Sequence, residues 1–196
     1  MSTGHPEGTM IAVVGPSGAG KDSLIDFARQ RLADNDDIAF VRRFITRNAD
    51  AGSEEHHALS LPEFDDMRRA GRFAVHWGAH DLHYGIPAET RDQLAAGRTL
   101  VVNGSRAALP DFLAAYRNLL VVTVTADADI IAERLKSRGR EDEAAISRRL
   151  ARSQQEWVID CPHHQLIDNS GALASAGAEF VRLILATARS GIPERA

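Results

Sequence analysis

Apolar and polar residues follow one another in blocks that predict strands and helices in alternation along most of the chain. Continuous apolar runs at residues 9–14, 99–103 and 119–125 are typical of strands that are buried on both faces of a sheet. Shorter runs at 38–41 and 165–167 complete five expected strands, with 99–103 as a central one. Segments with apolar residues at helical spacing predict helices at 21–33, 60–71, 87–97, 110–116, 127–135, 146–157 and 172–189. This alternation predicts an α/β fold, in which helices flank a parallel five-stranded sheet on both faces.

One stretch departs from the alternation and predicts a small inserted subdomain at residues 43–87. Ser60 and Glu63 have the spacing of a capping box and begin a helix, and the segments 73–77 and 83–85 predict a hairpin. The expected organisation is a single domain at 9–189, with this subdomain at 43–87, an arginine-bearing lid at 136–145, and tails at 1–8 and 190–196.

A glycine-rich loop stands between the first strand and the first helix. Gly-x-x-x-x-Gly-Lys from Gly15 to Lys21 matches the phosphate-binding P-loop, except that Asp22 replaces the usual Ser or Thr. A glycine-rich turn without a ligand is the alternative, but the lysine and the flanking strand and helix favour phosphate binding. We therefore expect ATP as the phosphoryl donor. The residues expected to contact it are Gly15, Pro16, Ser17, Gly18, Ala19, Gly20, Lys21, Asp22, Ser23 and, after the last strand, Asn169.

Asp22 occupies the position whose hydroxyl usually binds Mg²⁺ in P-loop proteins. A carboxylate is a suitable ligand for this hard cation, so we expect Asp22 to bind magnesium directly or through water, with Ser23 as the other candidate. The histidines lack the flanking ligands of a zinc site, and we expect them to be loop and surface residues.

Composition limits the partners that the protein can have. A net charge of −4 argues against a general nucleic-acid surface, and no apolar run is long enough for a membrane span. The single cysteine, Cys161, excludes an internal disulfide and is expected to be a packing residue. We expect a cytoplasmic protein that acts on a small phosphorylated molecule. The oligomeric state is open, with a homodimer as one candidate.

Arginines gather after the fourth predicted strand. Arg134, Arg138, Arg140 and Arg149 are candidates for stabilising the charge on a transferred phosphoryl group, and a solvated helix end is the alternative. Such a lid, together with the insert, could close over two substrates and exclude water. The residues expected to be catalytic are Lys21, Arg134, Arg138 and Arg149.

These features together resemble the guanylate kinase fold over roughly residues 9 to 185. Several strings are more similar to the bacterial ribose 1,5-bisphosphate phosphokinases of phosphonate breakdown. They are residues 15–24 with Asp22, 44–47, 51–54, 57–60, 102–106 and 138–141. The resemblance implies transfer of the γ-phosphoryl group of ATP to the 1-phosphate of ribose 1,5-bisphosphate, which gives 5-phosphoribosyl 1-diphosphate.

The departures from guanylate kinase concern the groups that read the nucleotide acceptor. Of two arginines three residues apart, Arg47 is present and Asp50 stands at the second position. A phosphate-binding tyrosine falls at His56, and the glutamate that reads guanine falls at Val75. Since valine cannot accept a hydrogen bond from a base edge, the resemblance implies that guanine recognition is absent.

The acceptor that this resemblance implies is already a phosphate oxyanion, so no general base is needed and catalysis is positioning and charge neutralisation. We expect Asn103 and Ser105 to bind ribose hydroxyls, and Arg47, Tyr84 and Arg106 to bind phosphates. A guanylate or other nucleoside monophosphate kinase is one alternative. A non-catalytic binding module is another, which Lys21 and the arginine-rich lid disfavour.

Overall fold

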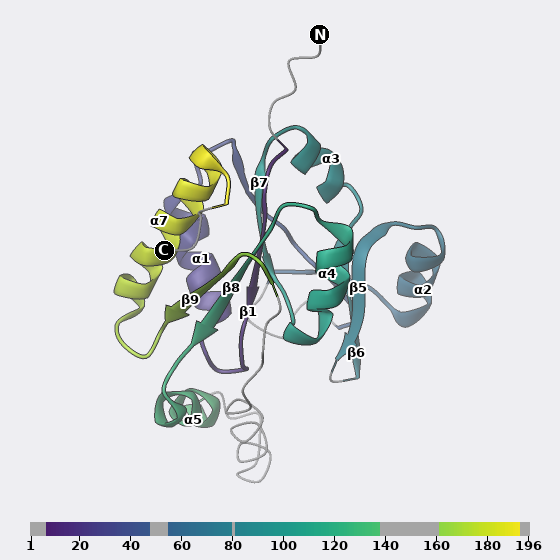
Figure 1. Ribbon diagram of the computed structural model, residues 1–196. Coiled ribbons are helices and arrows are strands. Elements are labelled where there is room, and N and C mark those ends of the chain that lie inside the picture. Colours follow the sequence, from purple (N-terminus) through teal and green to yellow (C-terminus); the bar gives the residue numbers. More distant parts are fainter. Residues whose placement is uncertain (1–6, 48–54, 80, 138–160, 193–196) are drawn as a thin grey trace.

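The structure is a computed structural model of the 196-residue chain, and it describes residues 7–47, 55–79, 81–137 and 161–192. Its main sheet has 5 strands in the order β2-β7-β1-β8-β9, all parallel (Figure 1). They are β1 (Met10–Val14), β2 (Ile38–Phe40), β7 (Thr99–Asn103), β8 (Leu119–Thr125) and β9 (His164–Asp168). The predicted α/β fold with a five-stranded parallel sheet is confirmed.

Helices cover both faces of the main sheet, because successive side chains of its buried strands point to opposite faces. On one face, Ile11 of β1 packs in a cluster with Leu24 and Phe180 of two helices, α1 and α7. On the other face, Ala12 packs in a cluster with Phe112 of α4. Figure 1 shows α1 and α7 on one side of the sheet and α4 on the other. The helices are α1 (Lys21–Arg31), α2 (Leu61–Arg69), α3 (Thr90–Ala95), α4 (Leu109–Ala115), α5 (Ala128–Ser137) and α7 (Leu173–Ser190), with a 3₁₀ turn at Arg106–Ala108.

The insert builds a second sheet of 4 strands in the order β4-β3-β6-β5. Its strands are β3 (Phe44–Ile45), β4 (His57–Ala58), β5 (Phe73–Ala79) and β6 (Leu82–Pro87). The predicted hairpin is formed by β5 and β6, which pair in antiparallel fashion. The predicted capping box is also present at the start of α2, where Ser60 N donates to Glu63 Oε2 (2.7 Å) and Glu63 N donates to Ser60 Oγ (3.4 Å). Ser60 also donates from Oγ to Glu63 Oε2 (2.6 Å), and this bond, together with the one from Ser60 N, holds the pKa of Glu63 below its ordinary value.

The prediction that residues 99–103 form a central strand of the sheet is confirmed. β7 is an interior strand that lies between β2 and β1, and β1 holds the middle position. Every interior strand of a parallel sheet is buried on both faces, so a continuous apolar run marks an interior strand without ranking it. The helix predicted at 146–157 lies outside the described residues, as does the predicted lid from residue 138 onward. No helix in the described part of the chain is both long and apolar enough to cross a lipid bilayer.

The packing of α7 on the main sheet predicts a large loss of stability for Phe180→Ala. Phe180 is fully buried, so the variant should lose about 3–5 kcal/mol of unfolding free energy in urea titrations. Leu173→Ala is the matched control, because Leu173 lies on the same helix with 39% of its surface exposed. It should lose less than about 1 kcal/mol. Equal losses in the two variants would contradict this account of the core.

Candidate active site

The loop of residues 15–20 joins β1 to α1 at the carboxyl ends of the parallel strands. Gly15 has φ +142°, and a Cβ built on it would lie 2.2 Å from the carbonyl oxygen of Val124. Gly20 has φ +90°, and its Cβ would lie 2.3 Å from the side-chain nitrogen of Asn169. Both positions accept only glycine without a rearrangement, so the loop lies directly against β8 and the residue that follows β9.

Lys21 is the first residue of α1, and its side chain folds back over the loop. Its ammonium group donates to the carbonyl oxygens of Gly15 (2.9 Å) and Pro16 (3.0 Å). Gly20 is the N-cap of α1 and supplies no side-chain hydrogen bond to the first turn of this 11-residue helix. The positive end of the helix dipole and the lysine charge therefore lie together, which is the electrostatic requirement for binding phosphate.

Two side chains from beyond the loop hold the carbonyl oxygen of Ala19. Asn169 donates to it through Nδ2 (2.7 Å), and Arg134 of α5 approaches it through Nη1 (3.4 Å). Arg134 also donates through Nη2 to the carbonyl oxygen of Asn169 (2.9 Å), so the two residues support each other. The sequence predicted Asn169 to bind nucleotide and Arg134 to be catalytic, and the structure brings both residues into contact with the phosphate-binding loop.

Asp22 of α1 is bonded to Asn103, the last residue of β7. Asn103 Nδ2 donates to Asp22 Oδ1 at 2.6 Å, across 81 positions of sequence. β7 pairs with β1 so that Asn103 lies opposite Val13, which places its side chain next to the start of the loop. The predicted metal ligand and a predicted ribose ligand are thus neighbours.

Three buried side-chain atoms among the described residues have no hydrogen-bond partner in the protein. They are Arg47 Nε, Asn103 Oδ1 and Asn169 Oδ1. A buried polar atom without a partner costs free energy, so such atoms in a native fold require an explanation. All three belong to residues that the sequence predicted to bind substrate or nucleotide.

Ser105 and Arg106 follow β7 at the same edge of the sheet. Ser105 is the N-cap of the 3₁₀ turn, and its carbonyl oxygen accepts from Ala108 N (3.0 Å). Arg106 is half-buried, and this desolvation lowers the pKa of its guanidinium. Since desolvation penalises the charged form, a bound anion would be favoured next to this side chain.

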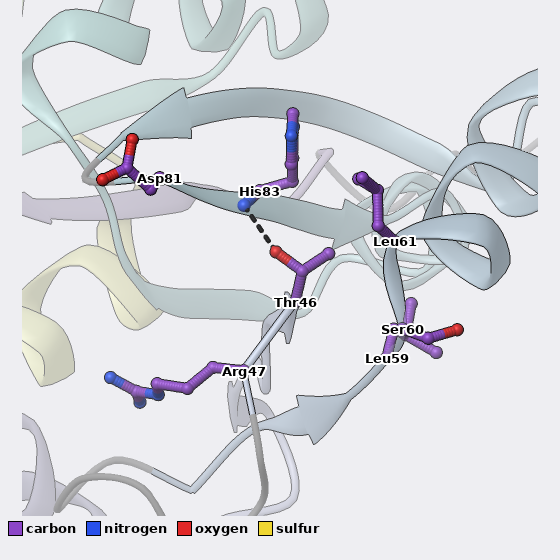
Figure 2. A pocket seen from close by; sticks show the side chains of 7 residues that line it. All are labelled: Thr46, Arg47, Leu59, Ser60, Leu61, Asp81 and His83. Atoms are coloured by element: carbon purple, nitrogen blue, oxygen red, sulfur yellow. Dashed lines mark hydrogen bonds between the residues drawn. The ribbon is translucent and has the colours of Figure 1, made fainter.

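Arg47 lies at a pocket of about 280 Å³ in the insert (Figure 2). Thr46 fixes one side of the pocket, because its backbone N donates to His83 O (3.0 Å) and its Oγ1 accepts from His83 N (2.8 Å). Figure 2 shows the Arg47 side chain extending away from Ser60 and Leu61. The residues that line the pocket are Thr46, Arg47, Leu59, Ser60, Leu61, Asp81 and His83.

Tyr84 does not line this pocket. Its ring stacks on Trp77 with centroids 5.3 Å apart, and the guanidinium of Arg43 lies 5.0 Å from the Tyr84 ring centroid. Arg43 is only 7% exposed, and sequence analysis did not single it out. An arginine beside a short apolar strand is usually solvated, so no sequence signal distinguishes this buried one.

The remaining predicted site residues fall into two groups. Arg138 and Arg140 of the predicted lid, Arg149 of the helix predicted at 146–157, and Asp50 of the insert lie outside the described residues. His56 and Val75, which the resemblance to guanylate kinase predicts at acceptor-reading positions, are described. His56 Nε2 lies 3.3 Å from Arg47 O, and Val75 is 3% exposed in the core.

Within the described ranges, no group of three or more His, Cys, Asp or Glu side chains is placed to hold a metal ion. Cys161 is buried in the core, as expected for a packing residue. A site with few protein ligands is still typical of Mg²⁺, which keeps several waters and takes further ligands from substrate phosphates.

Comparison with known proteins gives two kinds of relative. No protein-family model matches the chain. Over 184 residues the chain is 46% identical to the ribose 1,5-bisphosphate phosphokinase PhnN of Agrobacterium fabrum, covering 94% of this chain and 100% of that protein. It is 45% identical over 181 residues to the protein of the same name from Rhizobium etli, covering 92% and 91%. The equivalent protein of Desulfomicrobium baculatum is 46% identical over 182 residues, covering 93% and 97%.

Solved structures show a similar fold at low identity. Guanylate kinase from Anaplasma phagocytophilum has a TM-score of 0.62 at 14% identity, covering 92% of this chain and 86% of that one. A gluconokinase from Sinorhizobium meliloti has a TM-score of 0.51 at 19% identity, covering 94% and 95%. These two similarities establish a kinase fold and carry no information on the substrate.

The close approach of the loop to Asn169 predicts that Gly20→Ala weakens nucleotide binding. The new methyl group would displace the Asn169 side chain and strain a positive φ, so affinity for ATP in calorimetric titrations should fall at least about tenfold. Gly71→Ala is the matched control, because Gly71 has φ +66° with nothing within 4 Å of its Cβ position. It should share the strain and keep the affinity. A similar loss of affinity in both variants would show that the contact with Asn169 is unimportant.

Proposed function

Because the chain belongs to the ribose 1,5-bisphosphate phosphokinase PhnN family, we propose that it transfers the γ-phosphoryl group of ATP to ribose 1,5-bisphosphate. The acceptor oxygen belongs to the 1-phosphate, and the products are 5-phosphoribosyl 1-diphosphate and ADP. Both substrates are small phosphorylated molecules. We place the reaction in the cytoplasm, which agrees with a chain whose single cysteine excludes an internal disulfide.

The observation that carries the proposal is the set of buried atoms that lack a partner. Arg47 Nε is a donor, whereas Asn103 Oδ1 and Asn169 Oδ1 are acceptors, and the described part of the protein satisfies none of them. A donor suits a phosphate oxygen, and an acceptor suits a sugar hydroxyl, a base amino group or a bound water. These are the groups that a phosphorylated sugar and ATP would bring.

The donor site consists of the loop and the residues that hold it. Lys21 and the N-terminus of α1 supply positive charge for the outer phosphates, and Asn169 with Arg134 fixes the loop at Ala19. The residues that we assign to the nucleotide are Gly15, Pro16, Ser17, Gly18, Ala19, Gly20, Lys21, Asp22, Ser23 and Asn169. Arg134 contacts the loop, so we assign it to charge stabilisation during transfer, with Arg138 and Arg149 as its partners.

The acceptor site is assigned to the edge of β7 and to the insert. We assign Asn103 and Ser105 to ribose hydroxyls, and Arg47, Tyr84 and Arg106 to phosphates. The desolvated guanidinium of Arg106 supports this assignment, because a cation that has lost water gains most from a bound anion. The acceptor phosphate is already ionised, so transfer requires alignment and charge neutralisation and no general base.

Magnesium fits the residues present beside Lys21. Asp22 offers one carboxylate oxygen that no described residue bonds, and Asn103 Oδ1 is a buried acceptor in the same place. Oxygen atoms of this kind suit a hard cation. Bound magnesium supplies charge neutralisation at the phosphate oxygens of ATP. We therefore assign Asp22 as the protein ligand, directly or through water, with Ser23 as the alternative.

A coupled assay of ADP release with ribose 1,5-bisphosphate, GMP and AMP tests the acceptor. We expect kcat/KM for ribose 1,5-bisphosphate to exceed that for either nucleotide by at least about 100-fold, because an acceptor that leaves buried polar groups unpaired loses about that factor or more. Formation of 5-phosphoribosyl 1-diphosphate is then verified by mass spectrometry. A preference for GMP would identify a guanylate kinase and overturn the proposal.

Arg47 tests the acceptor phosphate site separately from the donor site. Arg47→Met should lower kcat/KM for the acceptor about 10- to 100-fold, the range expected for losing a charged hydrogen bond, and should leave the KM for ATP unchanged. Arg42→Met is the matched control, since the Arg42 side chain is exposed and pairs with Glu55 at 2.7 Å. It should behave like the natural protein. An effect of Arg47→Met on ATP alone would place Arg47 at the donor.

A further inference from the structure

The bond between Asp22 and Asn103 joins the residue after the loop lysine to the end of a strand that lies beside β1. In P-loop enzymes the loop supplies Ser or Thr after the lysine, and an Asp of the Walker-B segment completes the magnesium site. Here the residue after Lys21 is Asp22, and the apolar strand beside β1 ends in Asn103, 2.6 Å away from it. The carboxylate therefore comes from the loop, and the strand supplies a neutral amide.

The chemistry of the pair fixes which way the Asn103 amide faces. An ionised carboxylate only accepts hydrogen bonds, so the amide nitrogen must point at Asp22 and the amide oxygen must point elsewhere. Asn103 is 8% exposed, and its oxygen is buried without a partner. A buried acceptor held in this orientation beside a carboxylate is suited to a water molecule of a hydrated cation.

We propose that Asn103 is the positioning residue of a magnesium site. In this site the carboxylate comes from the loop, at Asp22, and the neutral side chain comes from the strand, at Asn103, which is the reverse of the usual arrangement. The Asn103 N–H holds one oxygen of Asp22, so that the second oxygen is presented to the cation, and the Asn103 oxygen accepts from a cation-bound water. The inference rests on the proposed use of ATP with magnesium and is independent of the acceptor's identity.

Charge explains why the two residues form a matched pair. An aspartate at position 103 would bring a second carboxylate to hydrogen-bond distance of Asp22, where like charges repel strongly. With serine at position 22, an asparagine at position 103 would leave the site without any carboxylate. Of the four combinations of Asp or Ser at position 22 with Asn or Asp at position 103, two provide one carboxylate and one neutral group. They are the natural Asp22 with Asn103, and the exchanged Asp22→Ser with Asn103→Asp.

The exchange can be tested on the full chain without the acceptor. Mn²⁺ replaces Mg²⁺, and its affinity is measured by electron paramagnetic resonance in the presence of a non-hydrolysable ATP analogue. The variants are Asp22→Ser, Asn103→Asp, Asn103→Leu, and the double variant Asp22→Ser/Asn103→Asp. Asn35→Asp is the control, because Asn35 Oδ1 caps a surface turn at Asp37 N and an aspartate can keep that bond. Melting temperatures identify any variant that does not fold.

We expect each single variant at Asp22 or Asn103 to weaken Mn²⁺ binding about 10- to 100-fold, the range of one charged hydrogen bond, with Asn35→Asp unchanged. The double variant should bind Mn²⁺ more tightly than either Asp22→Ser or Asn103→Asp alone, because it restores one carboxylate and one neutral partner. A merely structural role of Asn103 would not produce this recovery. If Asn103→Asp does not fold, recovery of folding and Mn²⁺ affinity in the double variant gives the same answer.

Two results would overturn the proposal. Additive losses in the double variant would show that the two positions do not act as a pair. Unchanged Mn²⁺ affinity in Asn103→Leu, with a raised KM for the acceptor, would assign Asn103 to the sugar alone. The two proposals can fail separately. If ribose 1,5-bisphosphate is not phosphorylated but the double variant recovers Mn²⁺ affinity, the proposed acceptor is rejected and the proposed magnesium site is retained.

Discussion

The loop of residues 15–20 can lie against the edges of β8 and β9 only because Gly15 and Gly20 carry no side chain. This close approach brings the carbonyl oxygen of Ala19 within reach of Asn169 and Arg134, which hold the loop from its far side. It also places Asp22, the second residue of α1, against the end of β7. The phosphate site is therefore a property of three strand ends and one helix, and the loop sequence is only its most visible part.

Three cationic side chains lie at the phosphate-binding edge of the sheet, although the chain as a whole is negatively charged. The net charge is −4, yet Lys21 and Arg134 contact the loop, and Arg106 is desolvated at the same edge of the sheet. A protein that attracted anions through its overall field would need an excess of cations over its whole surface. Here a few cations act at short range, where partial burial strengthens their attraction for phosphate.

In the insert, strand alternation separates neighbouring residues into different roles. His83 closes the Arg47 pocket together with Thr46, whereas Tyr84 stacks on Trp77 beside the buried Arg43. Successive side chains of a strand point to opposite faces, so the side chains of His83 and Tyr84 on β6 meet different neighbours. Arg43 lies over the Trp77 ring, and Trp77 in turn packs on Phe112 of α4. This cluster therefore joins the insert to α4.

The sequence alone determined the elements and the chemistry that is local in sequence. Hydrophobic runs identified the strands of the main sheet, the Ser60–Glu63 spacing identified a helix start, and Gly15 to Lys21 identified a phosphate loop, because each signal depends on neighbours only a few residues apart. The tertiary structure alone decided the order of the strands, the burial of Arg43 and the bond between Asp22 and Asn103. The reason is that strand order, burial and pairing depend on which segments the fold brings together. In the sequence, Asp22 is an exception to the P-loop motif. The structure shows that this aspartate is hydrogen-bonded to Asn103, which is 81 positions away.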